Sequence, residues 1–127
     1  MTENSVAQQI VDVAYRVHTA LGPGLLESVY EVVLASELKK RGLPVIRQLP
    51  VPITFEGTRF EVGFRADLLV GDLVMVEIKS IADFSPVHKK QLLTYLRLAN
   101  KKLGLLINFN EVLIKDGIIR VVNGLKD

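Results

Sequence analysis

Apolar residues recur every three or four positions in three stretches of the chain, which predicts three helices. These stretches are residues 5–21, 25–41 and 86–100. Ser5 or Asn4 is the expected N-cap of the first helix. In the second helix we expect Val29, Val32, Val33, Ala35 and Leu38 on the buried side. Gly42 is expected to end that helix, and Pro86 is expected to occupy the first turn of the third.

Apolar and β-branched runs between turn residues predict the strands. They are residues 44–55, 59–70, 74–79 and 103–109, followed by a final hairpin of 112–114 and 118–122. Pro50 and Pro52 require the first strand to lie at a sheet edge or to contain a bulge. The order is two helices, three strands, a helix, a strand and a hairpin. We therefore expect an α/β (α+β) fold, a mixed β-sheet flanked by helices, in a single domain of residues 1–127.

Composition places the chain among ordinary soluble proteins, with 49% hydrophobic and 24% charged residues. No apolar run approaches the roughly 20 residues that a membrane helix needs. The absence of cysteine excludes disulfides, thiolate metal sites and cysteine nucleophiles. The first residues show no signal-peptide pattern, so we expect a cytoplasmic protein without membrane partners.

The net charge of +2 gives weak support for nucleic-acid binding, since strong binders usually carry a larger basic excess. Lysine and arginine cluster at residues 39–41, 89–90 and 101–102. Solvated helix ends are the expected explanation for each cluster, because cations complement the negative end of a helix dipole.

Three charged residues, Asp67, Glu77 and Lys79, interrupt the apolar strands on either side of the Gly71-Asp72 turn. An unpaired buried charge is costly, so these residues are not explained by sheet stability. Two carboxylates beside an ammonium can hold a hard divalent cation and polarise a water molecule. A two-residue turn would place Asp67 opposite Val76, so joint action with Glu77 requires a three-residue turn or a bulge. The structural alternative is an ion-pair network within the sheet.

The spacing of these residues resembles a known family signature. Asp67 followed by Glu77-Ile78-Lys79 matches the D…(E/D)-x-K pattern of the PD-(D/E)XK nuclease superfamily, with Ala66 in place of the usual proline. Residues 91–95, QLLTY, resemble the Q-x-x-x-Y element found in one branch of that superfamily. Residues 24–30, GLLESVY, match the motif that names the GxxExxY protein family. The resemblance covers most of the chain and implies a restriction-endonuclease-like fold.

The resemblance also implies a metal centre. Asp67 and Glu77 would ligate Mg²⁺, or Mn²⁺ in its place, with help from the Ile78 carbonyl. Glu27 would complete or extend the site from its helix. An all-oxygen site of this kind suits Mg²⁺, which keeps several waters and binds one or two carboxylates plus substrate phosphate oxygens.

Further residues are expected to support catalysis. By the resemblance, Lys79 would orient or activate the attacking water and stabilise charge on the phosphate, while Gln91 and Tyr95 would steady that lysine or a phosphate. Arg65 is added from the strand pattern, because it shares a face with Asp67 and is expected to contact a phosphate.

The leading hypothesis is Mg²⁺-dependent hydrolysis of DNA, with RNA the less favoured substrate. One alternative is a catalytically silent module of the same fold that binds nucleic acid or a protein partner. Another is a nuclease that acts only after assembly with a partner or as a homodimer, because a 127-residue core leaves little surface for grasping duplex DNA.

Overall fold

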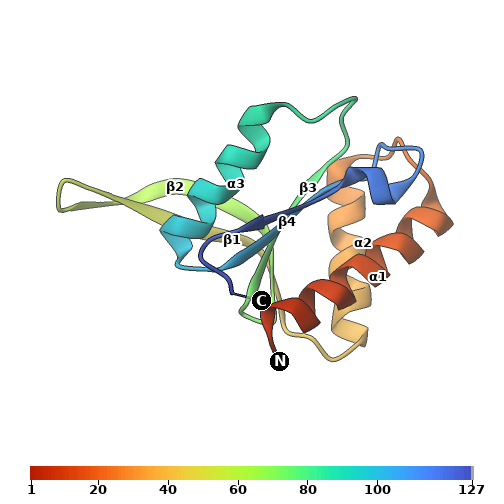
Figure 1. Cartoon of the computed structure of the whole chain (residues 1–127), viewed down its shortest axis with the longest axis horizontal. Coiled ribbons are helices and arrows are strands. Elements are labelled where there is room, and N and C mark those ends of the chain that lie inside the picture. The colour runs from red at the N-terminus through yellow and green to blue at the C-terminus, as the bar shows by residue number, and fades with distance from the viewer. Residues whose placement is uncertain (127) are drawn as a thin grey trace.

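The computed structural model describes residues 1–126, apart from the side chain of Val62; Asp127, the end of the predicted domain, lies outside the described residues. Within the described part, the chain forms a mixed five-stranded sheet with helices on both faces (Figure 1). The elements are α1 (Glu3–Leu21), α2 (Glu27–Lys40), β1 (Val45–Phe55), β2 (Thr58–Val70), β3 (Val74–Lys79), α3 (Pro86–Ala99), β4 (Leu103–Asn108), the 3₁₀ helix η1 (Ile114–Gly117) and β5 (Ile118–Val122). The predicted fold class is confirmed.

The strands lie in the order β1-β2-β3-β4-β5. Only β3 and β4 run parallel among the pairs of the described sheet, and the other neighbours are antiparallel. A parallel pair needs a crossover connection, which α3 provides. Figure 1 shows α1 and α2 on one side of the sheet and α3 on the other.

Two apolar layers fill the spaces between the sheet and its helices. Alternate residues of β3, including Val76 and Ile78, pack beneath α1 and α2. Met75 packs on the opposite face against Leu92 and Leu96 of α3. Because side chains alternate along a strand, Glu77 and Lys79 leave β3 on the same side as Met75, toward α3.

The first two helices differ in detail from the prediction. The N-cap of α1 is Thr2 and not the predicted Ser5 or Asn4, because the Thr2 hydroxyl accepts from the Ser5 N–H at 3.1 Å. In α2 the predicted buried positions Val29 and Val32 are exposed, at 38% and 47%. The predicted Ala35 and Leu38 are buried, and Tyr30, Glu31 and Leu34 complete the buried face of α2. No helix of residues 1–126 is long and apolar enough to cross a membrane.

A long hairpin of β1 and β2 projects from the body of the molecule (Figure 1). β1 lies at the edge of the sheet, and its register with β2 shifts between Val51 and Ile53. The two prolines of β1 are therefore accommodated both by an edge position and by a bulge, as the sequence predicted.

The final hairpin was predicted wrongly in one arm. Residues 112–114 do not form a strand: Val112 and Leu113 lie in an exposed loop, and Ile114 begins η1. Ile114 is buried beneath α1, so its side chain holds η1, and the loop before it, against the core. β5 then pairs directly with β4.

Candidate active site

The turn between β2 and β3 determines which residues of these strands face each other. Residues 71–73 form a three-residue loop, because Val70 pairs with Val74. Continued in the same register, this pairing places Asp67 opposite Glu77. The predicted three-residue turn is therefore confirmed, and the two acidic residues of the motif lie together.

β2 and β3 separate at this point and leave a fork in the sheet. Their last pair is Leu68 with Val76, whereas β2 continues beside β1. Inside the fork, Asp67 Oδ2 accepts from the Ile78 N–H at 2.8 Å. Glu77 Oε1 accepts from the Asp67 N–H at 3.2 Å. Where the strands separate, these two backbone N–H groups no longer bond to the backbone of the opposite strand. The carboxyl groups accept their hydrogen bonds in its place.

Both carboxyl groups bind their protons more tightly than usual. Burial raises the pKa of Glu77, and the charge of Asp67 raises it further, to about 8. Burial also raises the pKa of Asp67, with a second contribution from the charge of Glu31, against opposing effects of the Ile78 N–H and Lys79. Two neighbouring carboxyl groups of this kind share a proton at neutral pH unless a cation replaces it.

Lys79 provides positive charge beside the pair. Its ammonium lowers the pKa of both Asp67 and Glu77, so it lies within electrostatic range of each. Yet the ion pairs among the described residues do not include one between Lys79 and either carboxylate. The three residues are therefore close without forming the closed ion-pair network that was the structural alternative.

Tyr95 of α3 faces the same site from above the sheet. Burial raises the pKa of its hydroxyl, and the charges of Glu77 and Asp67 raise it further, while a hydrogen bond with Gln91 lowers it. Its ring stacks on Phe64 of β2, with ring centroids 3.5 Å apart and planes at 8°. This stack fixes the direction of the Tyr95 ring, whose hydroxyl lies within electrostatic range of the carboxyl pair and is hydrogen-bonded to Gln91.

An acidic residue that the sequence interpretation missed, Glu31 of α2, adds to this charge. It is buried, and its carboxylate accepts from Arg47 Nε and Nη2 at 3.1 and 2.9 Å. Gln48 Nε2 donates to Glu31 Oε1 at 2.5 Å and to Asp67 Oδ1 at 3.4 Å. Gln48 adopts a left-handed conformation with φ of 53°, which is uncommon for a residue other than glycine. The signal in the sequence was weak: Glu31 lies one helical turn after Glu27.

Two other predicted residues, Glu27 and Arg65, form no ion pair or hydrogen bond with Asp67 or Glu77 among the interactions of the described residues. Glu27 accepts from the Ser80 N–H at 3.0 Å, just past the end of β3, and Ser80 Oγ donates to the Leu25 carbonyl at 2.7 Å. Arg65 is exposed and lines a shallow cavity of about 400 Å³ on the β1–β2 hairpin together with Pro50. Among the described residues, no group of three or more His, Asp or Glu side chains is arranged to hold a metal ion, at the fork or elsewhere.

A comparison of the sequence with models of protein families identifies the superfamily of the chain. The model of the PD-(D/E)XK nuclease superfamily matches residues 4–121, nearly the whole chain. The chain belongs to the PD-(D/E)XK nuclease superfamily. Comparison with curated proteins found no significant match, and comparison with solved structures likewise found none.

Membership in the PD-(D/E)XK nuclease superfamily indicates a nuclease-type function, and nucleases of this superfamily typically use divalent metal ions. The donor set at the fork suits such an ion, because it consists of carboxyl oxygen atoms from Asp67 and Glu77. Burial and neighbouring negative charge raise the pKa of both carboxyl groups. A divalent cation bound between them would offset that negative charge.

Proposed function

We propose that the chain is a Mg²⁺-dependent nuclease that hydrolyses phosphodiester bonds of DNA, with Mn²⁺ able to replace Mg²⁺ and RNA the less favoured substrate. The main support is the pair of carboxyl groups at the fork, the half-buried Asp67 and the buried Glu77, which stand beside Lys79 without an ion pair to it. Removing both groups from solvent without a cation carries an energetic cost, which function explains better than stability does.

Each residue has a role that follows from its position. A divalent ion held by Asp67, Glu77 and the Ile78 carbonyl would supply Lewis acidity and lower the pKa of a bound water. Lys79 leaves β3 on the same side as Glu77, where its ammonium can donate to a phosphate oxygen and stabilise developing negative charge. Tyr95, held by its ring stack, and its hydrogen-bond partner Gln91 would steady Lys79 or a phosphate.

We also propose that the chain belongs to the GxxExxY branch of the superfamily, since two of the three named residues of that motif, Glu27 and Tyr30, both fasten the start of α2. Tyr30 donates to the Gly22 carbonyl at 2.5 Å and accepts from the Leu25 N–H at 3.1 Å, which closes the turn before α2. Glu27 fastens the start of α2 to Ser80 at the end of β3. The motif therefore holds α2, and with it Glu31, against the catalytic strand.

The deciding experiment compares DNA cleavage by the wild type and by the double variant Glu77→Ala/Lys79→Ala in Mg²⁺ and in EDTA. We expect metal-dependent cleavage that falls by at least about 100-fold in the variant, the scale seen when a transition-state stabilising group is removed. Asp116→Asn, which removes an exposed acidic residue of η1, is the matched control and should keep wild-type activity.

The outcome separates the nuclease from the silent module. Equal cleavage by the wild type and the double variant would refute the proposal for Glu77 and Lys79. Nucleic-acid binding without any cleavage, indifferent both to Mg²⁺ and to loss of Lys79, would support the binding module in its place.

A further inference from the structure

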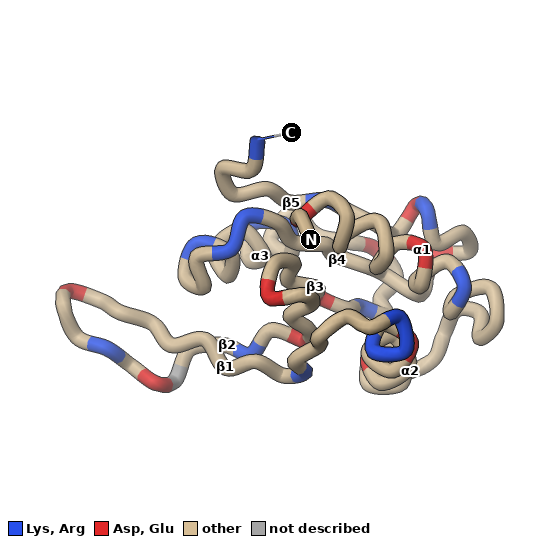
Figure 2. Tube along the Cα trace, turned by 90° about the horizontal axis from the view of Figure 1, so that it is seen from below, with Lys and Arg blue, Asp and Glu red and all other residues tan. Residues whose placement is uncertain are grey.

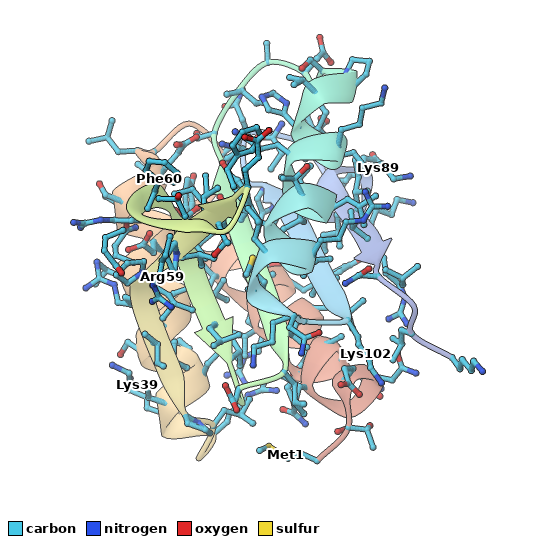
Figure 3. All side chains as sticks on the ribbon, turned by 90° about the vertical axis from the view of Figure 1, so that its left-hand side faces the viewer. Met1, Lys39, Arg59, Phe60, Lys89 and Lys102 are labelled. Carbon is cyan, nitrogen blue, oxygen red and sulfur yellow. The ribbon has the colours of Figure 1, made fainter. Side chains whose placement is uncertain are left out.

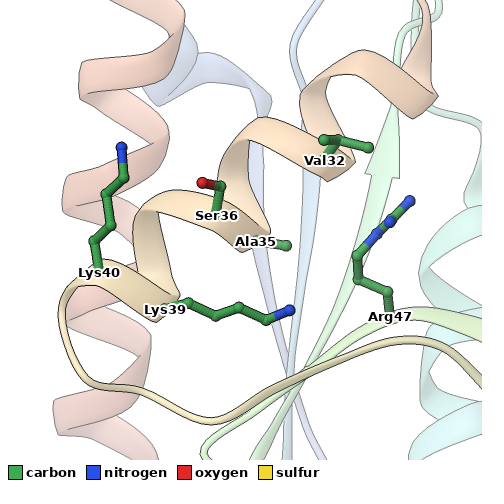
Figure 4. Close-up of a pocket in the computed structure, with 6 residues that line it drawn as sticks. All are labelled: Val32, Ala35, Ser36, Lys39, Lys40 and Arg47. Carbon is green, nitrogen blue, oxygen red and sulfur yellow. The ribbon is translucent and has the colours of Figure 1, made fainter.

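A groove lined by cations lies between α2 and β1 (Figure 4). Its volume is about 480 Å³. Its lining residues are Val32, Ala35, Ser36, Lys39 and Lys40 of α2 and Arg47 of β1. Figure 2 shows the matching concentration of Lys and Arg at the end of α2 that faces the viewer. The lining drawn from the described residues contains three cations and no acid, so the groove is suited to an anion.

The three cations are not equally compensated. Lys40 pairs with Glu37 at 3.0 Å, outside the lining of the groove. Arg47 uses Nε and Nη2 to bind Glu31, which orients its guanidinium. Lys39 forms no ion pair within the described residues, and Figure 4 shows its side chain extending from α2 toward Arg47. The groove therefore keeps uncompensated positive charge.

The groove adjoins the candidate active site through a short chain of contacts. Glu31 binds Arg47 on one side and Gln48 on the other, at 2.9 and 2.5 Å. Gln48 then reaches Asp67 at 3.4 Å. Gln48 has a left-handed backbone conformation, which is energetically costly for a residue other than glycine. It is the residue whose side chain links the groove to the carboxyl pair.

We propose that this groove binds the phosphate backbone of DNA beside the phosphate being cleaved, with Lys39 and Arg47 as the phosphate contacts. The proposal rests on the nuclease function proposed above. The chain of contacts from Arg47 to Asp67 links the groove to the carboxyl pair, and a polyanion with regularly spaced phosphates can occupy more than one phosphate site. Ser36 adds a hydroxyl donor to the wall of the groove, and hydroxyls commonly contact phosphate oxygens in protein–DNA complexes.

The helix dipole explains part of this pattern but not all of it. Lysines in the last turn of a helix stabilise it, which accounts for Lys39 and Lys40. It does not account for Arg47 on a different element, nor for the 47% exposure of Val32 at the wall of the groove. The convergence of cations from α2 and β1 is what distinguishes the groove from an ordinary helix end.

The test measures binding of a fluorescently labelled duplex DNA oligonucleotide in EDTA, where metal-dependent cleavage cannot proceed, over a range of salt concentrations. We expect Lys39→Met to weaken binding about fivefold and to reduce the slope of log K against log [salt] by about 1. Lys102→Met is the matched control, because Lys102 is also exposed and lies well apart from Lys39 (Figure 3). It should bind as the wild type does.

Cleavage assays in Mg²⁺ separate failure of the groove from failure of the function. Lys39→Met should raise KM for DNA and leave kcat near the wild-type value, because the groove contacts a phosphate away from the reacting one. If the wild type cleaves and both lysine variants match it in KM and salt slope, the groove proposal is overturned and the nuclease stands. Lys39-dependent binding without cleavage supports the groove and overturns the nuclease. No binding of duplex DNA by the wild type overturns the groove proposal.

Discussion

Glu77 keeps its proton to about pH 8, because burial and the neighbouring Asp67 both disfavour its charged form. The ordinary value for this side chain, 4.5, applies to the unfolded chain. Between pH 4.5 and about pH 8, the folded protein therefore keeps a proton on Glu77 that the unfolded chain has released. The stability that comes from this proton is fully present below pH 4.5 and is lost as the pH rises through 8.

We therefore predict that Glu77→Gln flattens the pH dependence of stability in metal-free buffer. Glutamine keeps an acceptor for the Asp67 N–H but cannot become charged. Above pH 8 the variant should exceed the wild type in free energy of unfolding by on the order of 2 kcal/mol, measured by urea unfolding in EDTA. Glu56→Gln, at the exposed tip of the β1–β2 hairpin, should keep the wild-type profile. A Glu77→Gln profile as steep as that of the wild type would contradict this account.

The sequence allowed Asp67, Glu77 and Lys79 to be selected, because charged residues stand out within apolar strands. Glu31 could not be selected in the same way. A glutamate in a helix usually faces solvent, and only its partners Arg47 and Gln48, distant in sequence, show that this one is buried.

At the scale of elements, the β2–β3 turn has the largest effect on the site. Its three residues include Gly71 and Asp72, both with left-handed backbone, at φ of 62° and 57°. This loop length sets the register that places Asp67 opposite Glu77. A register shift by one residue would move one carboxyl group to the other face of the sheet.

We predict that Gly71→Ala destabilises the protein more than Gly57→Ala, although both glycines occupy left-handed positions in hairpin turns. Each substitution costs about 1 kcal/mol for backbone strain. Alanine at Gly71 would also bring its Cβ to 3.2 Å from Val6 Cγ2, whereas the space around Gly57 is open. Thermal unfolding of both variants measures the difference. Equal losses would show that α1 does not restrict the turn.

Element prediction failed where tertiary contacts overrode a local pattern. The apolar run at 112–114 favours a strand, but its first two residues are exposed and Ile114 anchors a 3₁₀ turn under α1. In α2, the apolar Val29 and Val32 were expected inside, whereas Glu31 takes a buried place through its bonds to β1. Neither contact is visible in a local window of sequence.

At the scale of the whole molecule, the proposed binding of a divalent ion would be linked to folding, because the carboxyl pair is assembled only when β2 and β3 are paired. We predict that Mn²⁺ raises the melting temperature at pH 8, where the carboxyl pair gains most from a cation. At an ion concentration of about 100 times Kd the stabilisation is about 2.7 kcal/mol. Differential scanning calorimetry measures the shift.

The same titration with Asp67→Asn should show little or no shift, whereas Asp116→Asn should respond as the wild type does. A full Mn²⁺ response in Asp67→Asn would place the ion elsewhere on the protein. The distinction matters because a metal bound to scattered surface carboxylates also stabilises a folded chain.

Two backbone amides at the fork would report by NMR whether an ion is bound there. The amide protons of Asp67 and Ile78 are donated to the very carboxyl groups that an ion would engage. When a cation draws electron density from those oxygens, both amide hydrogen bonds weaken. In a ¹⁵N-labelled sample, these two amide resonances should move first during a titration with diamagnetic Mg²⁺, before any substrate is added. The separation of β2 and β3, which creates the site, would thus also allow the binding of a cation to be followed through the two amide resonances.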